Sequence, residues 1–158
     1  MAHNPTKNPK VTCAYGTKNH GGIVWQAGHH TGTDFAADYD DPIYAVLGGQ
    51  IIHIGQFGGW GLSYGIHVLV KSGDLIIGYC HLSSVNLKNV QDNILKEGEI
   101  IGYAGASGKA SGVHLHLEVR QAPYLYNNKT IDPMTLFKHP SSKPAKKATT
   151  KPAPKTTK

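Results

Sequence analysis

Residues 112–120 read GVHLHLEVR, and this stretch predicts a β-strand with two chemically different faces. Successive side chains of a strand point to opposite sides of a sheet, so His114 and His116 share one face. Val113, Leu115 and Leu117 alternate with them and belong on the other, apolar face. An apolar face suits a protein core, but two neighbouring histidines on the opposite face need a chemical reason. Other parts of the chain supply one.

Further strand patterns, rich in β-branched and aromatic residues, surround this stretch. Single strands are expected over residues 43–47, 50–55 and 99–105. Residues 66–73 and 75–82 predict a hairpin, because the polar, glycine-containing sequence KSGD joins two apolar runs. Together with 19 glycines and eight tyrosines, these patterns favour a mainly β protein.

The connecting segments are less regular. Residues 57–65 and 105–112 are rich in glycine and other small residues and predict loops, whereas residues 85–98 suit either a short helical turn or an irregular loop. Asp132 followed by Pro133 predicts the start of a short helix.

Length and charge define the domain organisation. A chain of 158 residues suits one domain. Residues 141–158 carry six of the 16 basic side chains and none of the 10 acidic ones, so the rest of the chain is neutral overall. We therefore expect a flexible N-terminus at residues 1–10, a folded domain at residues 11–138 and a disordered Lys/Pro/Thr-rich tail at residues 139–158.

The N-terminal sequence contains no apolar run long enough for a secretory signal, and no segment has the length of a membrane span. We expect a product made in the cytoplasm. Cys13 and Cys80 are too few for a disulfide framework. Two separate buried thiols are preferred, and a single disulfide stays open as the alternative.

Three histidine segments have metal-site character. They are GHHTGTDFAA at residues 28–37, YCHLSS at residues 79–84, and the pair His114 and His116. Each segment alone is weak evidence, because isolated histidines are common on surfaces and in cores. Together they offer a carboxylate and imidazoles in glycine-bordered strands and turns, a combination that zinc accepts with one position left for water. The remaining histidines are expected to be surface or structural ones: His3, His20, His53, His67 and His139.

The order of these motifs resembles the lysostaphin and LytM type of zinc endopeptidase. The family pattern is His-x-x-x-Asp, then His-Leu-Ser, then His-x-His followed by an apolar residue and a glutamate. The similarity extends over about residues 11–136. It implies a single domain of antiparallel β-sheets that forms a substrate groove.

The resemblance also implies the role of each site residue. His30, Asp34 and His116 would bind one Zn²⁺, and water would complete the coordination. His81 and His114 would be the catalytic histidines that do not bind the metal. The spacing of His114 and His116 alone does not say which of the two is the ligand.

Several features near the motifs leave alternatives open. His29 precedes His30, but the spacing to the aspartate favours His30 as the ligand. Cys80 is adjacent to His81, so we expect it to point to the opposite face and to be a core residue rather than a fourth metal ligand. Glu118 shares the face of His116 and suits either an orienting carboxylate or a solvated one.

Members of this family cut peptide bonds of bacterial peptidoglycan, in the stem peptide or in the cross-bridge. The glycine-rich loops, with Trp60 and Tyr64, are candidates for the groove walls. The cationic tail suits anionic wall polymers, or is function-neutral, or is a linker to another domain. A cytoplasmic product of this kind resembles a phage endolysin.

Two further classes of function have some support in the sequence. A catalytically inactive wall-binding or regulatory module on the same fold is the main alternative. A specific nucleic-acid-binding protein is disfavoured, because the body is neutral and has no recognition element. Nothing in the sequence indicates more than a monomer.

Overall fold

The hairpin predicted around KSGD lies at the centre of the sheet. Strand β5 (Ile66–Ser72) pairs antiparallel with β6 (Leu75–Val85), and Gly73 in the turn between them has a φ of 58°. Glycine adopts this left-handed conformation without steric cost, so the short turn is favoured. The computed structural model describes residues 2–56, 61–86, 88, 93–123 and 129–138.

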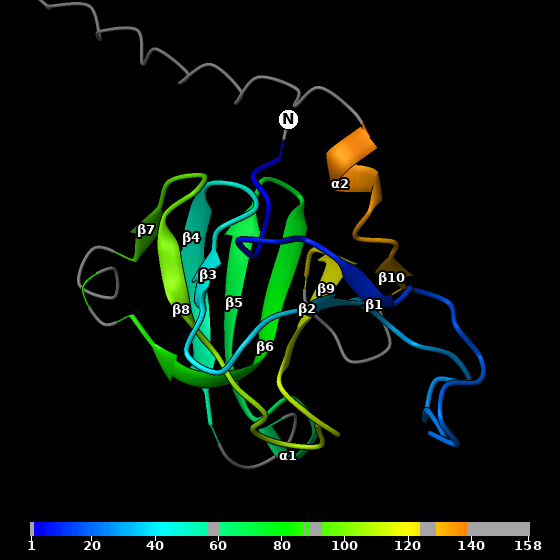
Figure 1. Cartoon of the computed structure of the whole chain (residues 1–158). Helices are drawn as coiled ribbons and strands as arrows, with labels where there is room; N and C mark the ends of the chain where they lie inside the picture. Colours follow the sequence, from blue (N-terminus) through cyan, green and yellow to red (C-terminus); the bar gives the residue numbers. More distant parts are fainter. Residues whose placement is uncertain (1, 57–60, 87, 89–92, 124–128, 139–158) are drawn as a thin grey trace, which may run out of the picture.

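The other strands extend the sheet on both sides of the hairpin (Figure 1). The hydrogen-bonded order is β1 (Val11–Cys13), β2 (Thr33–Ala36), β9 (His114–Gln121), β6, β5, β4 (Gly49–Gly55) and β7 (Ile94–Leu95). Outside this path, β10 (Thr130–Ile131) pairs with β9, and β3 (Pro42–Tyr44) pairs with β8 (Ile100–Ala104), which also pairs with β6. All of these pairings are antiparallel.

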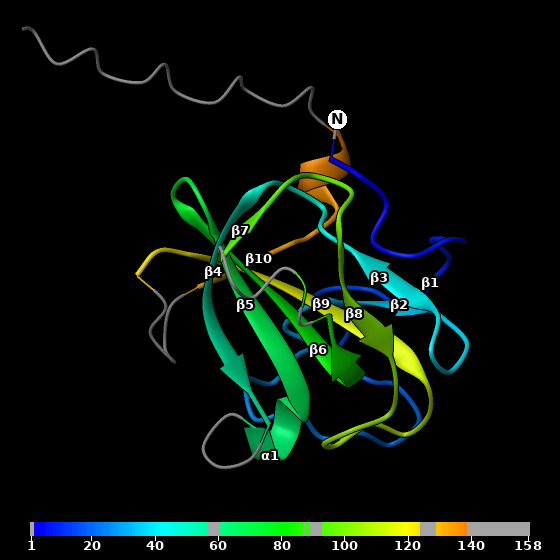
Figure 2. The ribbon, with the colours of Figure 1, turned by 90° about the vertical axis from the view of Figure 1, so that its left-hand side faces the viewer.

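The core lies between the central strands and the β3–β8 pair, which folds over one of their faces (Figures 1 and 2). Ile43 of β3 and Ile101 of β8 are buried in the same apolar cluster as Ile77 and Leu117 of the central strands. Tyr79 is fully buried there, and its hydroxyl oxygen accepts a 3.0 Å hydrogen bond from the backbone N–H of Val46.

The predicted fold class is confirmed, because the described residues are mainly antiparallel β-sheet with almost no helix. Each predicted strand has a counterpart, and Leu115 and Leu117 lie on the core face. The prediction that Val113 lies on the core face was wrong. Val113 precedes β9 and is 36% exposed, because the alternation begins only where the strand does.

The two short helices lie at opposite ends of the sheet (Figures 1 and 2). Helix α1 (Gly61–Tyr64) falls within the segment predicted as a loop, of which residues 57–60 lie outside the described residues. Helix α2 (Thr135–Lys138) follows Pro133, and Oδ1 of Asp132 accepts a 2.9 Å bond from Met134 N–H, as the sequence predicted for a short helix here.

The N-terminal segment makes backbone hydrogen bonds to the body of the domain. His3 N–H donates to the Val46 carbonyl at 2.9 Å, and Tyr44 N–H donates to the Pro5 carbonyl at 2.9 Å. The tail predicted at residues 139–158 lies outside the described residues. No helix in the described part of the chain is long and apolar enough to cross a membrane. Cys13 and Cys80 are both buried free thiols, as preferred from the sequence.

Candidate active site

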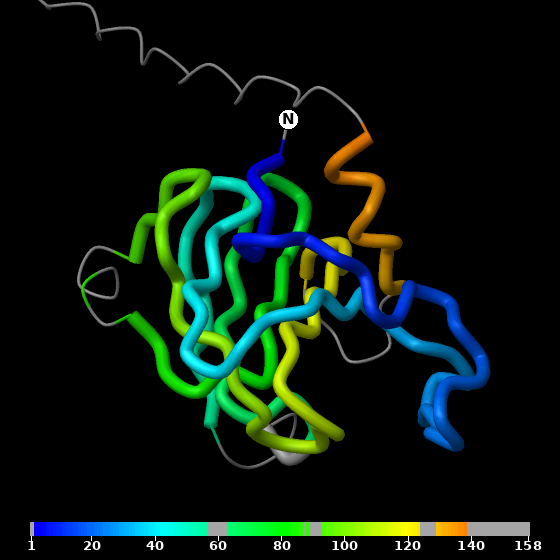
Figure 3. The backbone as a smooth tube through the Cα atoms, viewed as in Figure 1, coloured from blue at the N-terminus to red at the C-terminus, as the bar shows by residue number. Residues whose placement is uncertain are grey.

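The pairing of β2 with β9 brings the first and last histidine segments together. Asp34 lies directly opposite His116, and Ala36 lies opposite His114. Residues directly opposite in an antiparallel pair project to the same side, so Asp34 shares the face of both histidines. Residues 14–32 leave the sheet after β1 and return at β2 (Figure 3). His30 lies near the end of this segment, and its ring contacts Asp34 and His116 on this face.

Three potential ligand atoms converge at this point. His30 Nε2 lies 3.1 Å from Asp34 Oδ1, His116 Nδ1 lies 2.9 Å from the same oxygen, and the two ring nitrogens are 3.1 Å apart. In a tetrahedral zinc site with bonds of about 2.0 Å, ligand atoms are roughly 3.3 Å apart. The three side chains therefore fit one small divalent ion after small rotations.

The nitrogen of each ring that faces away from this point has an acceptor. His30 Nδ1 donates to the Ala14 carbonyl at 3.2 Å, and His116 Nε2 lies 3.3 Å from Glu118 Oε2. Metal-binding histidines typically donate their second N–H in this way, which sets the tautomer and the orientation of the ring. The donor set thus has the chemistry of a zinc site as well as its geometry.

Glu118 is held by a network of its own. It is 1% exposed, and its carboxylate accepts bonds of 2.6 Å from the Thr31 hydroxyl, the Tyr64 hydroxyl and Arg120 Nε. A buried carboxylate needs such partners, because desolvation otherwise disfavours its charge. Glu118 is therefore not a solvated edge carboxylate. It is the orienting group that the sequence left as one of two alternatives.

The carboxylates are strongly stabilised as anions. Burial opposes the charge of Asp34, but hydrogen bonds with His116 and His30 outweigh burial and hold the pKa of Asp34 well below its usual range. Burial likewise opposes the charge of Glu118, and His116 and Arg120 lower its pKa to about 2. Burial opposes the protonation of His116, whose bonds to Asp34 and Glu118 raise its pKa to about 9.

His81 and His114 form a second pair on the same side, with ring centroids 4.9 Å apart. His81 Nδ1 donates to the Ser107 carbonyl at 2.8 Å, and His114 Nδ1 donates to the Gly112 carbonyl at 2.9 Å. Both rings therefore keep an unprotonated Nε2. That of His114 lies 3.7 Å from Asp34 Oδ2.

The backbone at His81 has an unusual conformation that affects its neighbour. Its φ of 63° is uncommon for a residue with a Cβ atom, and such outliers often lie at functional sites. Cys80 pairs with His116 across β6 and β9, so Cys80 projects to the histidine face. Cys80 is fully buried, as predicted. Its side chain nevertheless lies on the face of His116, because the left-handed residue breaks the alternation that the prediction assumed.

Cys13 is another thiol at the site. It pairs with Asp34 across β1 and β2, and ligand atoms of Cys13, His30 and Asp34 lie within 4.8 Å of one another. Burial and the Asp34 charge raise the pKa of the Cys13 thiol. The contacts of 2.9–3.1 Å made by His116 are much closer, so we take His116 and not Cys13 as the third candidate ligand.

All five residues named from the sequence thus lie together: His30, Asp34, His81, His114 and His116. Sequence reasoning missed the supporting partners Thr31, Tyr64 as a hydrogen-bond donor, and Arg120. The strand alternation could have identified Arg120, which lies two residues beyond Glu118 on the same face. Trp60 lies outside the described residues.

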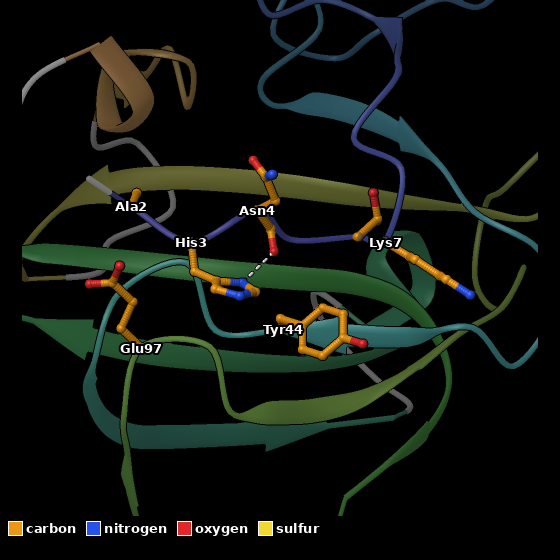
Figure 4. Close-up of a pocket in the computed structure, with 7 residues that line it drawn as sticks. Ala2, His3, Asn4, Lys7, Tyr44 and Glu97 are labelled. Carbon is orange, nitrogen blue, oxygen red and sulfur yellow. Dashed lines mark hydrogen bonds between the residues drawn. The ribbon is translucent and has the colours of Figure 1, made fainter.

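A separate pocket lies on another part of the molecule, between the N-terminal segment and β3. Ala2, His3, Asn4, Lys7, Tyr44 and Glu97 are among the residues that line it (Figure 4). His3 Nδ1 donates to the Asn4 carbonyl at 2.7 Å there. This pocket contains none of the five site residues, so the chemistry is not located in it.

Comparison with known proteins adds independent information about this site. A sequence model described as peptidase family M23 matches residues 28–133. The DD-carboxypeptidase/endopeptidase Mpg of Neisseria meningitidis serogroup B is 30% identical over 134 residues, which cover 84% of this chain and 28% of that protein. The chain therefore spans less than a third of the length of this relative.

Two solved structures share the fold. The catalytic domain of the antimicrobial peptidase lysostaphin from Staphylococcus simulans has a TM-score of 0.73 and 26% identity, over 88% of this chain and 100% of that domain. The catalytic domain of the prophage-encoded M23 protein EnpA from Enterococcus faecalis has a TM-score of 0.65 and 28% identity, over 80% of this chain and 90% of that one.

Proposed function

The chain belongs to peptidase family M23, and from this membership we propose that it is a zinc-dependent endopeptidase that hydrolyses peptide bonds of bacterial peptidoglycan. The observation that carries the proposal is the convergence of His30 Nε2, Asp34 Oδ1 and His116 Nδ1 within 3.1 Å of one another. The second histidine pair next to them supports hydrolysis over simple metal storage.

In this proposal, His30, Asp34 and His116 hold the zinc ion and residues 11–138 form the catalytic domain. When bound, zinc supplies a Lewis acid that acidifies water to a pKa of about 7 and polarises the scissile carbonyl. Glu118 fixes the orientation of the His116 ring through the contact between Glu118 Oε2 and His116 Nε2. Arg120 compensates the charge of Glu118. Among the three proposed ligands, Asp34 is the one carboxylate, and it would supply the negative charge next to the ion.

In this proposal, His81 and His114 transfer protons during hydrolysis and stabilise the negative charge that develops on the scissile carbonyl oxygen. Because their Nδ1 atoms donate to backbone carbonyls, each presents Nε2 as the acceptor. One can accept a proton from the attacking water, and the protonated ring can donate it to the leaving amine. Burial and the neighbouring histidines lower the pKa of His81 to about 3, so His81 is neutral when substrate binds.

Paired substitutions test this division of roles. His30→Ala removes a ligand, so it should lose both the metal and wall hydrolysis. His114→Ala removes a ring that binds no metal, so it should retain about one zinc per chain and lose roughly 10²–10⁴-fold in activity. Metal analysis and a turbidity assay on purified cell walls measure the two quantities. Retention of activity in both variants would contradict the proposal.

The same pair of measurements separates the enzyme from its main alternative, an inactive wall-binding or regulatory module. Such a module would bind walls with unchanged affinity in both variants and release no peptide. If the protein is an enzyme, the wild type should release peptides from the wall and the two variants should not. Mass spectrometry of the fragments then identifies the scissile bond, in the stem peptide or in a cross-bridge.

We also propose that the enzyme lyses the wall of a bacterial host for a phage. The support is the similarity to a prophage-encoded M23 protein. Expression in a bacterial host should leave growth unchanged until a membrane-permeabilising agent is added, and then cause lysis within minutes. Lysis that is the same in the His114→Ala variant would contradict this role.

The basic residues 141–158 are proposed to bind anionic wall polymers, because six lysines without acids attract polyanions. A variant that ends at Lys138 should bind isolated walls more weakly at low salt and equally at high salt. Equal binding of both forms at low salt would assign the tail no role in wall binding.

A further inference from the structure

We propose that Ser107 is a positioning residue for His81, one of the two histidines to which the proposed function assigns proton transfer. The role of His81 rests on that proposed function, whereas the positioning rests on the hydrogen bonds of Ser107. Ser107 lies between β8 and β9, and His81 lies on β6. The two residues come from separate segments that the fold brings together.

The backbone of Ser107 holds the imidazole of His81. The Ser107 carbonyl accepts a 2.8 Å hydrogen bond from His81 Nδ1–H. A neutral ring with its proton on Nδ1 has an unprotonated Nε2, which is the atom that can accept a proton from water. The position of the Ser107 carbonyl therefore sets both the tautomer and the direction of this ring.

The hydroxyl of Ser107 joins the same loop to two strands. It donates a 2.6 Å hydrogen bond to the Leu82 carbonyl and accepts a 2.9 Å bond from Ile66 N–H. Leu82 on β6 and Ile66 on β5 lie directly opposite one another. A hydroxyl is both a donor and an acceptor, so this one side chain fixes the loop to both strands, and a methyl group could make neither bond.

The backbone conformation of His81 needs such support. Its φ of 63° is a left-handed conformation, which persists in a residue with a Cβ atom only where the surroundings hold it. Ser107 bonds on both sides of this conformation, through the imidazole of His81 and the carbonyl of Leu82. Loss of the hydroxyl should therefore let residue 81 relax and its ring turn.

The loop that carries Ser107 packs closely on the segment that precedes β5. Lys109 N–H donates to the Ser63 carbonyl at 3.0 Å. Gly65 and Gly108 both have positive φ, and a Cβ atom at Gly65 would meet the backbone and the hydroxyl of Ser107. This close approach restricts movement of the loop, so the Ser107 carbonyl acts as a fixed acceptor.

Substitutions at Ser107 test this role in the full-length protein loaded with Zn²⁺. With soluble peptidoglycan fragments as substrate, Ser107→Ala should retain the metal and lower kcat by roughly 10- to 100-fold at unchanged KM, as expected for a displaced catalytic group. Ser107→Thr keeps the hydroxyl and should recover most of the lost kcat. Ser72→Ala is the matched control, because the Ser72 hydroxyl also donates to a backbone carbonyl, that of Gly48 at 2.7 Å. It should leave kcat unchanged.

Nitrogen-15 NMR of the imidazole rings supplies a readout that a merely structural role would not change. Wild-type His81 should carry its proton on Nδ1, and Ser107→Ala should show a mixture of the two tautomers at His81. Ser107→Thr should keep the wild-type tautomer, so the test does not depend on the folding of Ser107→Ala.

Two results would overturn the inference. One is a wild-type His81 that carries its proton on Nε2, and the other is an unchanged His81 tautomer in Ser107→Ala. Failure of the proposed function has a different signature, because the wild type would then release no peptide. The tautomers of His81 would still show whether Ser107 positions its ring.

Discussion

The chemistry of each site histidine is set by the ring nitrogen that faces away from the site. His30, His81 and His114 donate Nδ1–H to backbone carbonyls, whereas His116 directs Nε2 to Glu118. Three rings therefore present Nε2 to the site, and His116 presents Nδ1. A change to one of these outer acceptors should act through the orientation of a ring.

Glu118→Gln tests this at a residue that does not touch the proposed metal. The amide keeps the shape of the carboxylate but loses its charge, so Arg120 and His116 lose their anionic partner. We expect metal affinity to fall by about 10–100-fold, measured by competition with a chelator. Glu97→Gln, at an exposed carboxylate, should leave the affinity unchanged. Equal affinities in both variants would mean that Glu118 has no positioning role.

The lowered pKa of His81 predicts how stability depends on pH in the metal-free protein. The folded-state pKa is about 3, whereas an unfolded histidine has a pKa of about 6.5. The unfolded chain therefore binds more protons between these values. The contribution of neutral His81 is fully present above pH ~6.5 and is lost as the pH falls towards about 3.

His81→Asn should remove this dependence, because asparagine tolerates positive φ and does not titrate here. Between pH 7.5 and 4.5 the wild type should lose about 2 kcal/mol more unfolding free energy than the variant. Urea unfolding at the two pH values measures the difference. An equal loss in both proteins would show that His81 is not buried in its neutral form.

At the scale of the elements, the site depends on how closely β2 approaches β9. Gly32 precedes β2, and a Cβ atom there would lie 2.8 Å from His116 Nε2 and would also meet the Leu117 carbonyl oxygen. Close packing against β9 therefore requires glycine at this position.

Gly32→Ala should therefore displace His116 or separate the two strands. We expect a loss of about 1–3 kcal/mol in unfolding free energy, as for other overpacked sites, together with weaker metal binding. Gly112→Ala is the matched control, because its Cβ would meet no atom within 4 Å. Thermal unfolding with and without zinc distinguishes the variants. Similar behaviour of the two would contradict the close packing.

At the scale of the whole molecule, the core holds the β3–β8 pair against the central strands. Tyr79 of β6 contributes a polar link, because its buried hydroxyl accepts the Val46 N–H just after β3. Burial strongly raises the pKa of this hydroxyl, so it stays neutral and able to hydrogen-bond.

Tyr79→Phe should leave the Val46 N–H buried without a partner. The expected cost is about 1–3 kcal/mol of unfolding free energy, measured in urea. Tyr39→Phe, at a residue that is 68% exposed, should change stability by less than about 0.5 kcal/mol. A stability loss in Tyr79→Phe as small as that of Tyr39→Phe would contradict the proposed link.

The sequence by itself determined the mainly β fold and the central hairpin, and it predicted the five candidate site residues that the structure brings close together. Period-two alternation, turn composition and motif order are sequence patterns that can be read without knowing how distant segments pack together. The partners of Glu118 and the orientation of Cys80 were decided only by the tertiary structure. These features depend on strand register and on the left-handed backbone at His81, which bring residues from distant segments together and cannot be read from local patterns.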